Sequence, residues 1–152
     1  MSSNDKMKGT MINWNDEKCQ VTSHFTVKDC LYLHEWHRLA DVDRDGVYLH
    51  KLAALCQKLE EIRDILKCPI NVHSMFRSQA YNEDQKILPS DDVHSQSVAV
   101  DFDCEPVMTI EQVKNALRPL LESLDIRMEK GTTTWIHIDM RAPGPSGREF
   151  IP

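Results

Sequence analysis

Apolar residues along this chain recur at two different spacings, and the change between them predicts a mixed α+β domain. Helical spacing, with an apolar residue at every third or fourth position, runs over residues 49–67 and resumes after Thr109. Alternation of apolar and polar residues marks two strands, at 98–103 and 135–140. We therefore expect a small antiparallel sheet packed against helices.

Two local signals place the starts of helices. Thr26 is followed three residues later by Asp29, and Thr109 by Gln112. Both pairs have the spacing of a capping box, in which the two side chains satisfy backbone N–H groups at a helix start. Because apolar residues continue beyond the first pair, we expect the first helix to cover residues 27–39.

The two alternating strands carry polar groups that can converge on a metal ion. In the first strand the carboxylates share the face opposite the apolar residues, and in the second the same holds for His137 and Asp139. Two imidazoles and one carboxylate from residues 92–103 and 135–139 supply three ligands. They leave the fourth tetrahedral position open, as in catalytic zinc sites.

These stretches resemble the signature of the zinc D-alanyl-D-alanine peptidases. Residues 135–139 resemble its W-x-H-x-D part, and residues 70–78 its strand and S-G-Y-R-S turn. The other part, S-x-H-x-x-G-x-A-x-D, resembles the stretch with His94, Ala99 and Asp101, in which Ser97 stands at the glycine. The likeness runs from about residue 23 to residue 141, in the family's order.

The resemblance implies a hedgehog/DD-peptidase fold with one zinc ion on the sheet. Carried over by position, His94, Asp101 and His137 would bind zinc, and Arg77 would hold the carbonyl or carboxylate of the substrate. The implied activity is that of a zinc metallopeptidase, of the D-Ala-D-Ala carboxypeptidase or peptidoglycan endopeptidase type. Zinc-activated water would hydrolyse peptide bonds of bacterial cell-wall peptides.

The general base departs from the family pattern. Many members carry a catalytic Glu or Asp three residues before the last histidine, where this chain has Thr134. A threonine cannot accept a proton near neutral pH. We predict that Asp139 takes this role, because it shares a strand face with His137, and Glu129 on the preceding strand is the alternative.

A second class of function stays open, in which the chain is a non-catalytic structural or binding component. Such a component, for example of a phage particle, would retain the peptidase fold, with or without the metal. It is favoured by Thr134, by Asp92 and Ser97 in place of the signature serine and glycine, and by the polar arm over residues 1–22.

Length and composition indicate the domain organisation, the class of partner and the state of the cysteines. The 152 residues, 41% of them hydrophobic, suit a polar arm at 1–22 and a single domain at 23–152 that ends in a Pro/Gly-rich tail. A net charge of -6 argues against nucleic-acid binding, which depends on clustered Lys and Arg. The five cysteines, without a C-x-x-C motif, are expected to be free thiols.

The sequence has neither an apolar segment typical of a signal peptide nor one long enough to insert into a membrane. We therefore expect synthesis in the cytoplasm. The chain would then act on the cell wall only when released or carried by a phage particle. The arm at 1–22 is the candidate surface for a protein partner.

A second metal pattern lies between the first two helices. Asp41, Asp43 and Asp45 match the first half of a calcium loop, but Leu52 stands at the twelfth position, where a bidentate Glu belongs. We favour a solvated loop, with weak calcium binding as the alternative.

Overall fold

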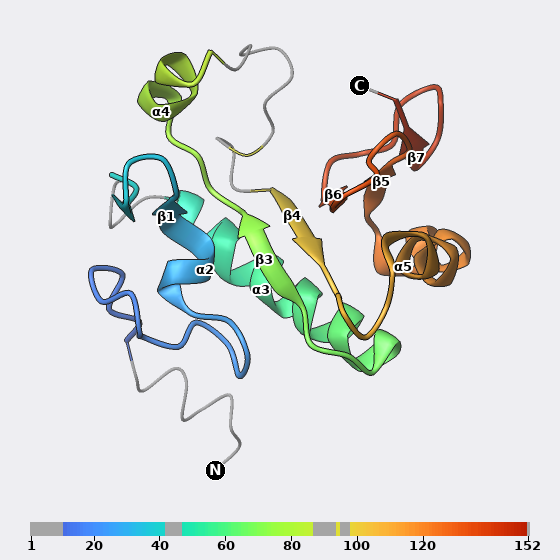
Figure 1. Cartoon of the computed structure of the whole chain (residues 1–152), viewed down its shortest axis with the longest axis horizontal. Coiled ribbons are helices and arrows are strands. Elements are labelled where there is room, and N and C mark those ends of the chain that lie inside the picture. The colour runs from blue at the N-terminus through green and yellow to red at the C-terminus, as the bar shows by residue number, and fades with distance from the viewer. Residues whose placement is uncertain (1–10, 42–46, 87–93, 95–97, 152) are drawn as a thin grey trace.

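A five-stranded sheet forms the centre of the computed structural model (Figure 1). The structure describes residues 11–41, 47–86, 94 and 98–151. In spatial order the strands are β3 (Asn71–Ser74), β4 (Ala99–Asp103), β6 (Ile136–Asp139), β5 (Arg127–Glu129) and β7 (Glu149–Phe150).

The sheet is antiparallel except at one edge. β3, β4, β6 and β5 pair antiparallel, as the alternation predicts, but β7 pairs parallel with β5. The expected antiparallel sheet therefore forms, with one parallel edge strand that the sequence did not predict. The tail crosses the surface through an exposed stretch at 142–146 and then returns to the sheet, and a two-residue strand is too short to show an alternating pattern.

The two faces of the sheet differ in polarity. One face is apolar and fully buried, and it contributes Val100, Phe102, Met128, Ile136 and Ile138 to the core. The opposite face carries Asp101 and His137, which are paired across β4 and β6. The register therefore determines that the predicted carboxylate and imidazole are neighbours on the polar face.

Helix α3 (Val47–Leu66) crosses behind the sheet in Figure 1 and forms much of the core. Its side chains at helical spacing are fully buried, including Leu52, Leu55, Leu59 and Ile62. The predicted helix over 49–67 is confirmed. No helix in the described part of the chain combines the length and the apolar character needed to cross a membrane.

The first predicted helix is much shorter than expected. The Thr26–Asp29 capping box is present, but α2 ends after five residues (Val27–Leu31). β1 (Tyr32–Leu33) and β2 (Arg38–Leu39) then form an antiparallel hairpin. Leu31 and Leu33 are both buried, and residues two apart face nearly opposite sides of a helix, so a continuous helix would expose one of them.

The second capping box also forms, between Thr109 and Gln112 at the start of α5 (Ile110–Leu117). A 3₁₀ turn, η3 (Arg118–Leu120), and the short α6 (Leu121–Leu124) follow. Pro119 lies within this 3₁₀ turn, where its missing N–H breaks the helical ladder.

The described part of the N-terminal arm contacts the domain. Val21 is buried in the core, and Ile12 and Trp14 pack against it. The Thr22 hydroxyl donates a hydrogen bond to Glu60 of α3 at 2.7 Å. The arm boundary at residue 22 and its role toward a partner stay predictions.

Candidate metal centre

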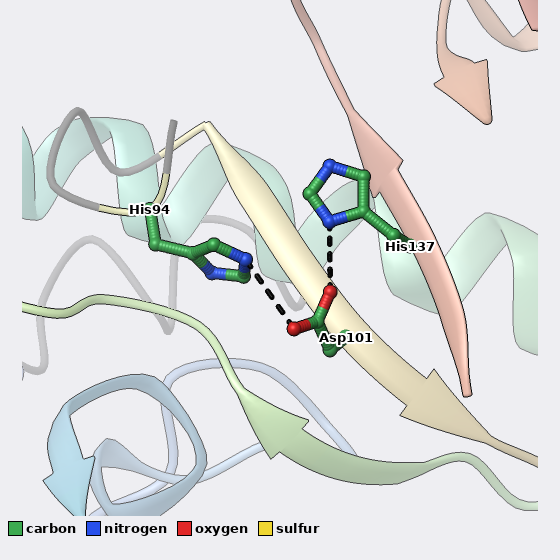
Figure 2. Close-up of side chains that lie close together, drawn as sticks. All are labelled: His94, Asp101 and His137. Atoms are coloured by element: carbon green, nitrogen blue, oxygen red, sulfur yellow. Dashed lines mark hydrogen bonds and ion pairs between the residues drawn. The ribbon is translucent and has the colours of Figure 1, made fainter. Parts of the chain in front are cut away.

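Three side chains predicted to bind metal converge on the polar face of the sheet. Asp101 lies on β4 and His137 on β6, whereas His94 comes from the segment before β4 (Figure 2). Each offers one ligand atom, and these atoms lie within 4.8 Å of one another. They are close enough to bind a single ion.

The orientation of His94 is set by a backbone carbonyl. Its Nδ1 lies 2.7 Å from the carbonyl oxygen of Met75. Because a carbonyl only accepts, Nδ1 carries the proton and donates it. The other nitrogen, Nε2, faces Asp101 Oδ2 at 3.4 Å. The ring is 2% exposed, so its orientation is also restricted by packing.

His137 presents its nitrogens the other way round. Its Nδ1 lies 2.8 Å from Asp101 Oδ1, and its Nε2 lies 3.4 Å from Asp139 Oδ2. The His94 and His137 rings meet edge to face, with centroids 5.3 Å apart. Asp101 therefore lies between two imidazoles (Figure 2), and each directs one nitrogen toward it.

This donor set fits a divalent metal of the zinc type. Two imidazole nitrogens point at carboxylate oxygens, and lone pairs on such groups repel unless a proton or a cation lies between them. Two imidazole nitrogens and one carboxylate oxygen are a typical ligand set for zinc. A backbone carbonyl that orients one of the imidazoles is a typical outer-shell partner. The triad can therefore hold a metal.

The pKa values of Asp101 and His137 also favour a positive charge between these two side chains. Burial would raise the pKa of Asp101, but hydrogen bonds from His137 and His94 lower it well below its usual range. Burial would lower the pKa of His137, but hydrogen bonds to Asp101 and Asp139 raise it to about 9. A proton and a metal ion would therefore compete for Nδ1 of His137, which faces Asp101.

Asp139, the predicted general base, is fully buried and bound on both oxygens. Arg127 Nε donates to Oδ1 and Nη2 to Oδ2, both at 2.8 Å, and the Arg141 N–H donates to Oδ1 at 3.1 Å. Burial opposes ionisation, yet these bonds and that from His137 lower the Asp139 pKa to about 2. Its role as general base stays a prediction.

The alternative base, Glu129, lies on β5, the strand that pairs with β6. The register pairs Arg127 with Asp139 and Met128 with Ile138. Because side chains alternate along a strand, Glu129 shares the face of Arg127, opposite the buried Met128. Glu129 is half-buried. Thr134 is exposed in the turn that precedes β6.

The remaining predicted residues lie on neighbouring segments. Arg77 is half-buried and directly precedes Ser78, the N-cap of α4 (Gln79–Asp84). It follows Met75 by two residues, and its role in substrate binding stays a prediction. Asp41 pairs with Arg38 at 3.2 Å, while Asp43, Asp45, Asp92 and Ser97 lie outside the described residues.

Sequence reasoning missed Arg127, the Met75 carbonyl and Phe150, all of which support the triad. Arg127 could have been found by extending the predicted hairpin, because the strand register pairs it with Asp139. A carbonyl acceptor leaves no mark in a sequence. Phe150 lies in a strand that was not predicted.

Comparison with known proteins identifies the family. A family model described as Peptidase M15 matches residues 23–139, which include all three triad residues. No curated protein and no solved structure matches the chain. The family match confirms the resemblance found in the sequence. This chain therefore belongs to the peptidase M15 family of zinc D-Ala-D-Ala carboxypeptidases and endolysin-type peptidases.

Proposed function

We propose that this protein is a zinc-dependent peptidase with the hedgehog/DD-peptidase fold that hydrolyses peptide bonds of bacterial cell-wall peptides. The observation that carries the proposal is the convergence of His94, Asp101 and His137 within 4.8 Å. Family membership supports the peptidase class, and the donor set supports zinc.

The three residues would hold the metal through His94 Nε2, an Asp101 oxygen and His137 Nδ1. When bound, zinc supplies Lewis-acid chemistry, since it lowers the pKa of a water ligand and polarises a carbonyl. The chain has to orient the peptide and remove the proton from the attacking water. Met75 and Asp139 already occupy the outer nitrogens of the two imidazoles.

Arg77 is proposed to hold a carbonyl or carboxylate of the peptide. A guanidinium forms paired, charge-assisted hydrogen bonds with such groups, and it would stabilise negative charge that develops on the scissile carbonyl oxygen. Its position two residues after Met75 supports this role, because the Met75 carbonyl contacts His94.

Two carboxylates are candidates for the proton acceptor. Both oxygens of Asp139 accept hydrogen bonds from Arg127. The pKa of Asp139 is about 2, which makes it a weak base near neutral pH. Glu129 lies on the strand paired with that of His137, directly after Met128, and is half-buried. These observations shift our preference from Asp139 to Glu129.

The test is cleavage of purified peptidoglycan by the full chain, followed as release of peptide fragments. Wild type should release fragments, chelation should stop the release, and added zinc should restore it. His94→Ala should be inactive. His24→Ala is a matched control, because it removes a histidine–carboxylate pair with Glu60 away from the triad.

Equal release by wild type and His94→Ala would refute the enzyme proposal and favour a non-catalytic structural or binding component. In that case zinc-loaded wild type would also cleave nothing, and Thr134→Glu would test whether a base restores activity. Glu129→Gln and Asp139→Asn separate the two base candidates, since only loss of the true base should lower turnover while zinc remains bound.

A further inference from the structure

Arg127 and Asp139 form a buried pair behind the metal triad. Two hydrogen bonds of 2.8 Å join the guanidinium to the two carboxylate oxygens. Asp139 is fully buried, and the Arg127 side chain is 13% exposed. The two residues are cross-strand partners on β5 and β6, so the sheet register itself sets their geometry.

The Arg127–Asp139 pair contacts the metal triad at His137. Asp139 Oδ2, which accepts from Arg127, also faces His137 Nε2 at 3.4 Å. This contact directs the opposite nitrogen, Nδ1, toward Asp101. Rotation of the imidazole by half a turn about its axis would exchange the nitrogen and carbon positions and break the contact with Asp139.

Phe150 of β7 contacts both Arg127 and His137. The Arg127 guanidinium carbon lies 4.0 Å from the centre of the Phe150 ring, and the His137 ring meets Phe150 edge to face at 5.9 Å. The parallel pairing of β7 with β5 brings this ring over the polar face of the sheet. A segment near the chain end thus packs against a metal ligand.

We propose that Arg127 and Asp139 are positioning residues, which hold His137 with Nδ1 toward the metal, and that Phe150 keeps the guanidinium in place. This inference rests on the proposed metal centre. Outer-shell carboxylates that orient a histidine ligand contribute about 10- to 100-fold to metal affinity. Asp139 therefore acts through His137, which gives it a role different from that of a general base.

The experiment measures zinc affinity in the full chain by chelator competition, and the absorption spectrum of the cobalt-substituted protein. The variants are Asp139→Asn and Arg127→Lys, which retains the positive charge but loses the paired hydrogen bonds. Arg38→Lys is the control. Arg38 pairs with the carboxylate of Asp41 at 3.2 Å, and both side chains are exposed.

We expect Asp139→Asn and Arg127→Lys to weaken zinc binding by about 10- to 100-fold and to change the cobalt spectrum. Arg38→Lys should leave both unchanged. A pair with a purely structural role would lower the urea midpoint of the metal-free protein but leave zinc affinity and the spectrum of the folded protein as in wild type. Zinc affinities of both variants within about twofold of wild type would overturn the proposal.

Two outcomes separate this inference from the proposed function. Failure of wild type to bind zinc would overturn both. Zinc binding by wild type that is lost in His94→Ala but kept in both variants would overturn the positioning role alone. Should Asp139→Asn fail to fold, Arg127→Lys decides by the same criterion.

Discussion

Zinc binding to this protein should strengthen as pH rises, because a proton and the metal compete for Nδ1 of His137. Hydrogen bonds to Asp101 and Asp139 outweigh burial and raise the pKa of His137 to about 9. Below that pH the imidazole carries a proton that zinc must displace. The apparent affinity should therefore rise about tenfold per pH unit and level off above a pH of about 9.

The size of the effect follows from the pKa. With a pKa of about 9, roughly one molecule in a hundred has an unprotonated His137 at pH 7. Zinc affinity at pH 7 should then be about 100-fold below its high-pH limit, which corresponds to about 2.7 kcal/mol. An unperturbed histidine would show almost no such loss, because its pKa is about 6.5.

The assay is chelator competition at several pH values, corrected for protonation of the chelator. Calorimetry in buffers of different ionisation enthalpy would count the protons released, and about one per zinc is expected from His137 at pH 7. An affinity that does not change between about pH 7 and pH 9, with no proton release, would refute the assigned charge state of the triad.

Three further predictions concern stability. Phe102→Ala should lower the free energy of unfolding by about 3–5 kcal/mol in urea titrations, because Phe102 is fully buried on the core face of β4, the strand that also carries Asp101. Lys114→Met should cost about 3 kcal/mol by the same measurement, since the buried Lys114 ammonium donates to the carbonyls of Lys130 and Thr132 in the turn between β5 and β6. Thr26→Ala should cost about 1 kcal/mol through loss of its capping box, and a cost near zero would show that the short α2 is held by packing alone.

The sequence by itself determined the features that depend on spacing along the chain. The long helix α3, both capping boxes and the two alternating strands follow from local periodicity, and the structure confirms them. The family resemblance rested on motif spacing, and it named the three side chains that converge in the structure.

Tertiary structure decided what supports that triad. The Arg127–Asp139 pair depends on the register between β5 and β6, and the His94 orientation depends on a carbonyl at Met75, nineteen residues away. The hairpin in place of a longer first helix, and the parallel strand that carries Phe150, also depend on packing. Local propensity cannot encode such features, because the contacts that stabilise them join residues that are distant in the chain and meet only after folding.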